Sequence, residues 1–441
     1  MTVLADLAGR STRAPLEAGA PIRSLAALHV LDTAGCVIAG ASHPLAAGLA
    51  ALAGVNGGGG LPVTGLAGRH PLRTAVLVES VLAHVDEYDA LHPAAAVVPS
   101  AVTVPAALAV ADHEDLPGRA VVDAVIAGYE AVVEAGARFG GPRLYERAWW
   151  PTALFGALGA AAATASLLSL DRDRTTAALG IASAGLGGLL GSDVLGTGHY
   201  LLTGRAAADG VEAAYLARAG ADASGTLLDG PAAAALGADL ARTRPGGADG
   251  PHLAGCSFKS YPCARPLHAA LDALAALMEQ GVPVAAARRI DIGLPGPLLR
   301  FVTADRNPPG PTEAAASAAF AVAALLAGAA GDVAFYRGTL PPGTPEITLI
   351  PAPDLERHLP ERWSARVIVR PPGGGPPREE MREAAAAPDE EDLRAKFQRQ
   401  LGPARDERAA DAWIARCLAL DEVPSARDLR RSLQDCCSAR H

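Results

Sequence analysis

The residues best suited to chemistry in the first half of the sequence are gathered in His84-Val-Asp-Glu-Tyr-Asp-Ala-Leu-His92. Three carboxylates and two imidazoles fall within nine residues, directly after an apolar helical pattern. A carboxylate beside an imidazole orients the ring and raises its basicity, as general base catalysis requires. Asp89 and His92 are therefore candidate catalytic residues. The alternative is a solvated helix end with capping charges, and we interpret Asp86 and Glu87 in that structural way.

A second group of polar residues occupies Phe258-Lys-Ser-Tyr-Pro-Cys263 and the helix start that follows. Lys259 is one of few lysines in an Arg-rich chain, and its neighbours are apolar or small. A partly desolvated ammonium would bind a substrate carboxylate or act as an acid or base, whereas the alternative is a surface lysine at a domain junction. Tyr261 is a candidate proton donor or a packing residue. Arg265 and His268 are candidate substrate-binding residues.

Two further places in the sequence combine aromatic or imidazole side chains with helix starts. His199 follows Gly196-Thr-Gly198 and precedes an apolar helical pattern, where a ligand anion would meet the N–H groups of the helix end. It is a third catalytic candidate, with helix capping or packing as the alternative. Trp149 and Trp150 are expected to line a pocket wall and contact substrate, and core packing is the alternative for either one alone.

The composition excludes several classes of protein. The 441 residues carry a formal net charge of −9 without a basic stripe, which argues against a nucleic-acid partner. The six cysteines match no zinc spacing and are interpreted as free thiols, and Gly54-Val-Asn-Gly-Gly-Gly-Gly60 lacks the Gly-Lys-Ser/Thr ending of a phosphate loop. No uninterrupted apolar run reaches the ~20 residues of a membrane span, and no signal peptide is recognised. We expect a soluble, cytoplasmic protein without a metal.

The hydrophobic pattern predicts a mostly helical chain. Half of the residues are hydrophobic but only 4% are aromatic, and Ala and Leu favour closely packed helices. Helices are predicted from Pro21 to Gly40 and at about 70–85, 99–112, 117–138, 151–168, 172–190, 203–219, 264–280, 311–327, 391–400 and 406–419. Strands are predicted near 289–293, 345–350 and 365–370, and the charged segment 379–394 is expected to be exposed. Gly35, inside the first pattern, suggests close contact with another helix.

Short motifs follow one another along nearly the whole chain, and their order is more specific than any one of them. They are Leu31-Asp-Thr-Ala-Gly35 with Gly40, the stretch from His84 with Val104-Pro-Ala-Ala-Leu-Ala, Gly128-Tyr-Glu130 with Arg138, Trp150-Pro-Thr152 with Gly156 to Ala162, Gly204-Arg-Ala-Ala-Ala-Asp-Gly210, Phe258 to Cys263 with His268, and Glu390-Glu-Asp-Leu-Arg-Ala-Lys-Phe397. In this order they resemble the MmgE/PrpD family, which includes 2-methylcitrate dehydratases, cis-aconitate decarboxylases and iminodisuccinate epimerases.

The resemblance implies a mainly α fold, in which an all-α helical-bundle domain carries an inserted, smaller α+β lid domain. On this chain the helical domain would be residues 1–258 and 395–441, and the lid domain 259–394. The resemblance also implies a homodimer, an active site in the cleft between the domains, no cofactor, and a small carboxylic acid as substrate. The family's chemistry is removal of a proton or carboxylate beside carboxylates.

Four positions depart from the residues that many dehydratase and decarboxylase members carry. Val98 stands where those members have a His, Trp150 where they have a His, His199 where they have a Lys, and Phe301 where they have a Tyr. The matching residues that remain are Asp89, Lys259, Tyr261 and His268. The usual histidine catalysis therefore does not transfer directly, and the substrate need not be a tricarboxylate.

Three functions follow from this pattern. The first is a cofactor-independent lyase, most simply a dehydratase of a 2-methylcitrate-like or specialised-metabolite hydroxy acid, including a tailoring enzyme for a polyketide or similar acid. His92 or His199 would remove the proton alpha to a carboxylate or carbonyl, Lys259 and Arg265 would stabilise the enolate-like charge, and Tyr261 would assist loss of hydroxide. The second is an epimerase or isomerase that uses the same proton abstraction. The third is a non-catalytic binding protein with a degenerate active site.

Overall fold

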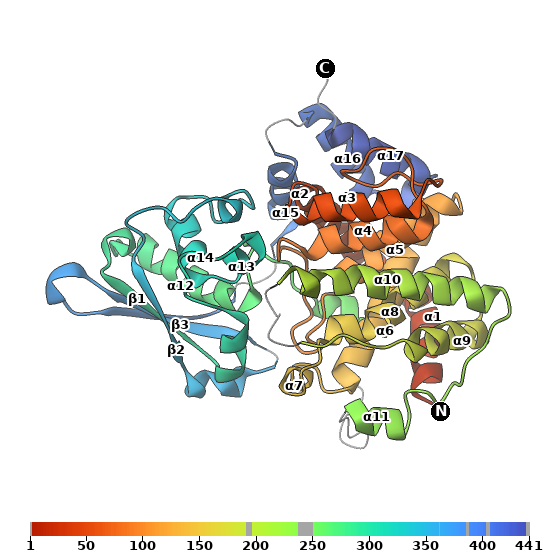
Figure 1. The fold of residues 1–441 in the computed structure, drawn as a ribbon, viewed down its shortest axis with the longest axis horizontal. Coiled ribbons are helices and arrows are strands. Elements are labelled where there is room, and N and C mark those ends of the chain that lie inside the picture. The colour runs from red at the N-terminus through yellow and green to blue at the C-terminus, as the bar shows by residue number, and fades with distance from the viewer. Residues whose placement is uncertain are drawn as a thin grey trace.

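The computed structural model describes residues 2–190, 196–236, 250–360, 362–384, 388–402 and 406–437. A large body of helices lies beside a smaller body built on a sheet (Figure 1). Each body has its own apolar core: the larger core draws on helices from both ends of the chain, and the smaller runs from Cys263 to Val369. The predicted mainly α fold with a smaller α+β part is confirmed. The domain boundaries at 259 and 394 stay predictions.

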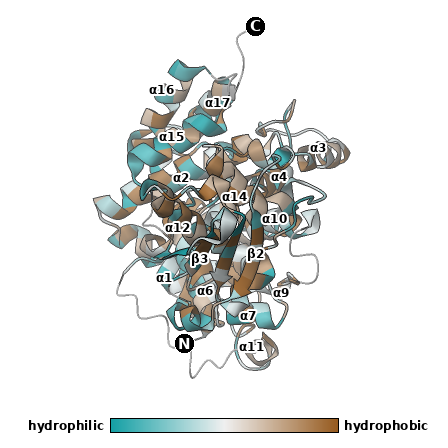
Figure 2. Ribbon diagram, turned by 90° about the vertical axis from the view of Figure 1, so that its left-hand side faces the viewer, coloured by the Kyte–Doolittle hydropathy of each residue, from teal (hydrophilic) through white to brown (hydrophobic). Residues whose placement is uncertain are grey.

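The helical body comes from the N-terminal part of the chain and its last segments. Its helices are α1 (Val3–Glu17), α2 (Ala20–Gly40), α3 (Leu45–Asn56), α4 (Leu72–His84), α5 (Pro99–His113), α6 (Gly118–Arg138), α7 (Arg143–Glu146), α8 (Pro151–Leu167), α9 (Arg172–Ala184), α10 (Thr197–Arg218), α11 (Pro231–Leu236), α15 (Glu390–Gln400), α16 (Glu407–Leu418) and α17 (Ala426–Cys437). In Figure 2, α16 and α17 alternate hydrophilic and hydrophobic residues, as amphipathic helices do.

The smaller body places one long helix and several short ones against a four-stranded sheet. Its elements are α12 (His268–Glu279), α13 (Pro311–Ala315), α14 (Ala318–Leu326), β1 (Arg289–Leu294), β2 (Glu346–Pro351), β3 (Ser364–Arg370) and β4 (Arg378–Glu383). The strand order is β2-β1-β3-β4, with β1 and β2 parallel and the other pairs antiparallel. Ile290 on β1 is opposite Ile347 on β2 and Val369 on β3, so one row of apolar side chains crosses the sheet.

Most predicted elements are present, and the differences have local causes. Asp171, interpreted as a helix start, is the N-cap of α9, and its side chain accepts a hydrogen bond from the backbone N–H of Arg174 at 2.8 Å. The helix predicted at 311–327 is broken, because Ser317 caps a new helix, α14. The start of the charged segment predicted at 379–394 is mostly exposed as expected, but it forms edge strand β4; residues 385–387 lie outside the described residues, and Leu393 is buried. Helices α1 and α17 lie outside the predicted patterns.

Small residues set the distance between the central helices. The close helix contact predicted at Gly35 is present in the structure: a Cβ at Gly35 would overlap the side chain of Gln400, so α2 and α15 approach closely there. Likewise, a Cβ at Gly210 on α10 would overlap the carbonyl oxygen of Ala157 on α8 and lie 2.8 Å from the Cβ of Ala160. Helix α2 is long and apolar enough by composition to cross a membrane, but 72% of that window is buried inside the protein.

Gly210→Ala is expected to destabilise the protein by about 1–3 kcal/mol, because the added methyl group forces α10 away from α8. Gly48→Ala on α3 is the matched control, since no atom lies within 4 Å of the added Cβ. That change should stabilise the helix by about 0.5–1 kcal/mol. Urea unfolding of both variants measures the difference, and equal stability of the two would contradict the close contact of α8 and α10.

Candidate active site

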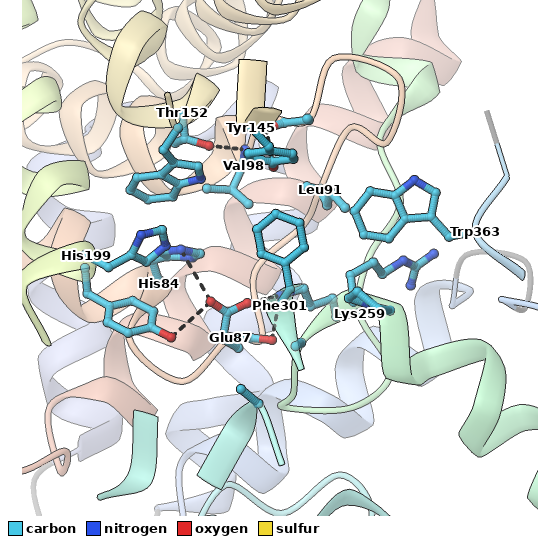
Figure 3. Close-up of a pocket in the computed structure, with 17 residues that line it drawn as sticks. His84, Glu87, Leu91, Val98, Tyr145, Thr152, His199, Lys259, Phe301 and Trp363 are labelled. Atoms are coloured by element: carbon cyan, nitrogen blue, oxygen red, sulfur yellow. Dashed lines mark hydrogen bonds and ion pairs between the residues drawn. The ribbon is translucent and has the colours of Figure 1, made fainter. Parts of the chain in front are cut away.

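A pocket of about 630 Å³, solvent at its mouth included, is lined by residues of both bodies (Figure 3). Its walls are His84, Glu87, Leu91, Ala96, Val98, Tyr145, Trp150, Thr152, His199, Tyr200, Lys259, Ala264, Arg265, Pro266, Phe301, Ala316 and Trp363. Leu298 and Trp363 of the smaller body belong to the apolar core of the helical body, and Phe301 packs against it. The pocket therefore lies where the two bodies meet.

Three helices of the larger body begin at this pocket. Val98 and Trp150 are the N-caps of α5 and α8, and the proline after each residue suits the first turn of a helix. The backbone N–H of Val98 donates to Thr152 Oγ1 at 3.0 Å, which ties the two helix starts together (Figure 3). His199 and Tyr200 lie in the first turn of α10. The positive ends of three helix dipoles thus face one pocket, which favours an anionic ligand.

Glu87 is held in an unusual backbone conformation directly after α4. Its φ of 53° lies in the left-handed region, which is uncommon for a residue other than glycine. This turn directs both its carbonyl and its carboxylate to Lys259, whose Nζ is 2.8 Å from Glu87 O and 2.8 Å from Glu87 Oε2. The other carboxylate oxygen accepts a hydrogen bond from Tyr200 at 3.1 Å. Burial alone would raise the pKa of Glu87, but Lys259 and His84 outweigh burial and lower the pKa to about 2.

His84, on the pocket wall, forms a buried pair with Asp89, which lies behind it. His84 Nδ1 is 2.9 Å from Asp89 Oδ1, and because a carboxylate only accepts, the ring donates there, so Nε2 is the proton-accepting atom of the neutral ring. That Nε2 is buried and has no hydrogen-bond partner among the described residues, with Glu87 Oε1 at 3.7 Å. Burial lowers the pKa of His84, but the carboxylates of Asp89 and Glu87 outweigh it, so the pKa is raised above 6.5.

Aromatic rings surround the His84 imidazole. Trp150 stacks on it with ring centroids 5.4 Å apart, and Tyr200 lies at 5.2 Å. His199 lies against Trp150, with their centroids 3.8 Å apart. Burial, aided by His84, lowers the pKa of His199 to about 3, so this ring is neutral near pH 7. A stacked indole stabilises the imidazolium form of His84.

Arg265 reaches the pocket from the smaller body. Its Nη1 is 3.2 Å from His268 Nδ1, and His268 Nε2 is 3.4 Å from the carbonyl of Cys263. Burial lowers the pKa of His268 well below its ordinary value, with Arg265 and Lys259 adding to the effect, so a neutral ring accepts from the guanidinium. His268 therefore orients Arg265 without balancing its charge.

Lys396 on α15 binds both loops that carry the site. Its Nζ donates to the carbonyl of Tyr88 at 2.7 Å and to that of Lys259 at 3.1 Å, and it pairs with Asp32 on α2 at 2.6 Å. The ammonium also lies 3.7 Å from the centroid of the Tyr88 ring. Burial lowers the pKa of Lys396, but its pairing with Asp32 outweighs burial and raises the pKa above its ordinary value, which keeps the ammonium charged.

The structure brings four of the sequence-predicted residues to the pocket wall: Lys259, His199, Arg265 and Trp150. Two others lie behind it and act through a neighbour, Asp89 on His84 and His268 on Arg265. Tyr261 lies outside the wall and donates to Asp272 Oδ1 at 2.9 Å. Trp149 also lies outside it, paired with Leu189.

His92 is outside the pocket because of the strand-like path of its loop. Leu91 forms a two-way backbone bridge with Ser257, and neighbouring side chains on such a path point in opposite directions. Leu91 therefore lines the pocket, whereas His92 accepts from the backbone N–H of Ala95 at 3.2 Å and its ring is 6.2 Å from that of His252. Burial and His252 lower the pKa of His92 to about 4.

Three central residues are absent from the sequence-based candidates: His84, Glu87 and Tyr200. The signal that could have found His84 and Glu87 was their place in the stretch with Asp89, since His84 is five positions before that carboxylate. Nothing local marks Tyr200, which reaches Glu87 from α10. Glu87, interpreted as a structural capping charge, instead joins Lys259, Tyr200 and His84 at the pocket.

All four departures from the expected family residues lie on this one pocket: Val98, Trp150, His199 and Phe301. His84, Glu87 and His199 also bring possible ligand atoms within 4.8 Å of one another, a spacing that would suit a metal ion. However, Lys259 and Tyr200 already bind the two carboxylate oxygens of Glu87, and an adjacent ammonium repels a metal cation.

Comparison with known proteins assigns the family. The MmgE/PrpD N-terminal domain matches residues 5–237, and the chain belongs to the MmgE/PrpD family. Among curated proteins, the cis-aconitate decarboxylase-like protein oryM of Aspergillus oryzae (strain ATCC 42149 / RIB 40) is 30% identical over 165 residues. That match covers 36% of this chain and 34% of the relative, so it spans about a third of each protein.

The His84–Asp89 pair can be tested by NMR titration of the His84 imidazole. In the wild type the ring should titrate above 6.5, and in Asp89→Asn it should titrate at lower pH, because burial persists after the carboxylate charge is removed. Only the neutral ring can accept a proton. In the wild type this form therefore becomes the major one at a higher pH than in Asp89→Asn. His199 is the internal control and should show no titration above pH 5. The same midpoint in both proteins would contradict the pair.

Lys396→Met is expected to destabilise the protein by about 3–5 kcal/mol, because it leaves the buried carboxyl group of Asp32, whose pKa burial already raises, without its partner. Lys396→Met with Asp32→Asn removes the uncompensated charge and should recover a large part of that loss. Guanidinium unfolding of the single and double variants provides the comparison. A single variant as stable as the wild type would show that this contact does not hold the two loops together.

Proposed function

We propose that this protein is a cofactor-independent lyase that removes the proton alpha to a carboxylate or carbonyl, most simply as a dehydratase of a hydroxy acid. The observation that carries the proposal is His84 on the pocket wall, because Asp89 holds its Nδ1 and its buried Nε2 has no hydrogen-bond partner among the described residues. A base oriented in this way is what proton abstraction needs. Membership of a family with a decarboxylase-like relative supports lyase chemistry in general.

In the proposed reaction His84 takes the place that sequence reasoning gave to His92 or His199. His84 Nε2 accepts the proton from the substrate carbon, and the electron pair of the C–H bond forms the double bond. The neighbouring C–O bond breaks, and hydroxide leaves as water with a proton from an acid. Lys259 is suited to that role, because among the described residues its ammonium donates two of its three N–H groups, both to Glu87.

Charge that develops on the substrate carboxylate or carbonyl during proton removal would be stabilised by two features of the pocket. The guanidinium of Arg265 lines it, and the N-terminal ends of α5, α8 and α10 point to it. After proton transfer the His84 imidazolium would be balanced by Asp89 and Glu87. Tyr200, whose pKa is raised well above 10 by burial and Glu87, stays protonated and holds Glu87 in place.

Two alternatives use the same pocket. An epimerase would return the proton to the opposite face of the carbon, and no group would leave. A non-catalytic binding protein would bind the acid without exchange of its proton, and the apolar replacements at Val98, Trp150 and Phe301 are the observation that favours it. The homodimer and the cytoplasmic location expected from the sequence also stay proposals.

Proton NMR in deuterated water with a panel of 2- and 3-hydroxy acids tests the reaction. The wild type should exchange the alpha proton of its substrate and produce an alkene signal. His84→Gln and Lys259→Met should each lower the rate by about 10²–10⁴-fold, the range for loss of a general base or acid. Circular dichroism should show that both variants are folded.

His92→Gln is the matched control, because His92 is in the same loop but outside the pocket, and its rate should stay close to that of the wild type. Exchange with inversion and without alkene would replace the dehydratase by the epimerase. An acid that binds in the pocket and exchanges no proton would favour the binding protein. Full activity of His84→Gln would show that His84 is not the base.

A further inference from the structure

The cationic groups of the pocket differ in how far their charge is already balanced. Among the described lining residues, Lys259 and Arg265 are the lysine and arginine side chains. The ammonium of Lys259 lies 2.8 Å from the carboxylate of Glu87, so this pair is neutral overall. His199 is neutral near pH 7 because burial lowers its pKa to about 3. His84 has a raised pKa, and when its ring is protonated the carboxylate of Asp89 beside it balances the positive charge.

Arg265 is the group left to receive an anion. Its Nη1 contacts the neutral ring of His268, and its buried Nε has no hydrogen-bond partner among the described residues. Burial lowers the pKa of Arg265, and the carboxylate of Asp272 only partly opposes that effect. A buried guanidinium with an open N–H donor matches one carboxylate.

The remaining wall is apolar and rich in aromatic rings. Leu91, Val98 and Trp150 come from the helical body, and Phe301 and Trp363 come from the smaller body (Figure 3). The hydroxyl of Tyr145 is already bonded to the protein, since it donates to the carbonyl of Ala96 at 3.2 Å, and its ring packs edge-on against Phe301 at 4.7 Å. A second or third carboxylate of a substrate would meet these apolar side chains with only the partial charge of the helix N-termini beside it and no further cation. A buried charge without a full counter-charge is strongly disfavoured.

We propose that the substrate is an acid with a single carboxylate, which Arg265 binds, and with an aromatic or bulky apolar group that lies among Trp150, Phe301 and Trp363. Its acidic C–H bond would then be presented to His84. This inference rests on the proposed function for the role of His84, but the selectivity for one carboxylate rests on the pocket wall alone. Di- and tricarboxylic acids would be poor ligands of this pocket.

Calorimetry with unreactive probes tests the selectivity. 3-Phenylpropanoate carries one carboxylate and an aromatic ring, propane-1,2,3-tricarboxylate carries three carboxylates, and 3-phenylpropanamide carries the ring without charge. At neutral pH the phenylpropanoate should bind at least about tenfold more tightly than either of the other two probes. Quenching of the pocket tryptophans by the aromatic probes reports the same binding independently.

Arg265→Gln should weaken 3-phenylpropanoate by about tenfold or more and leave 3-phenylpropanamide unchanged, which also shows that the variant is folded. Arg382→Gln, on the exposed edge strand β4, is the matched control for a general loss of positive charge and should leave both affinities unchanged. Tricarboxylate binding as tight as that of phenylpropanoate, including undetectable binding of both, overturns the inference. So does equal phenylpropanoate affinity of Arg265→Gln and the wild type.

The outcome separates this inference from the proposed function. None of the three probes has a leaving group, so binding is measured without turnover. One outcome is that phenylpropanoate binds selectively but no hydroxy acid that binds exchanges its proton. That outcome would support the inference and contradict the proposed lyase activity. Proton exchange and alkene formation from a tricarboxylic acid would support the lyase while overturning the inference.

Discussion

The buried ammonium of Lys396 is the contact on which the geometry of the site depends. It neutralises Asp32 inside the helical body and binds the backbone carbonyls of Tyr88 and Lys259. Those carbonyls belong to the two loops that carry Glu87, Asp89 and the pocket lysine, so one side chain from α15 fixes their spacing. A buried charge tolerates little displacement, because each lost partner exposes an unsatisfied group in an apolar core. The position of the catalytic candidates is thus set from behind the pocket.

The side chains that face the pocket are held mainly by contacts with one another. Its polar groups are largely paired with each other, Lys259 with Glu87 and His84 with Asp89, while the residues that differ from the expected family pattern form the wall. Val98 and Trp150 are N-caps, so a change at either position alters the pocket without disturbing the helix that follows, since the proline after it still starts that helix. The helical frame can therefore be retained while the surface offered to the substrate changes.

Apolar periodicity was sufficient to predict the helices that frame the site and the mainly α class, because a buried helix face leaves a repeating pattern. Edge strand β4 escaped that reasoning because backbone pairing, rather than side-chain burial, holds its charged residues in the sheet. At the site, Lys259 and Arg265 were found from residue type and motif. His84 and Tyr200 were not, because their importance arises from contacts with Asp89 and Glu87 that only the folded chain creates. The direction of His92 depends on a bridge to Ser257, which no local pattern encodes.

The hydrogen bond from Lys396 to Tyr88 joins positions that are 308 residues apart, so the ribosome makes one partner well before the other. During synthesis at about 5–20 residues per second, roughly 15 to 60 s pass between the appearance of one partner and the other. Through that interval Asp32 and the carbonyl of Tyr88 must stay hydrated or bound by something else, because neither can be buried alone. The helical body can therefore begin to form on the ribosome, but the loops around the pocket reach their final places only when α15 has emerged. The pocket therefore takes its final form late, after most of the chain has been synthesised.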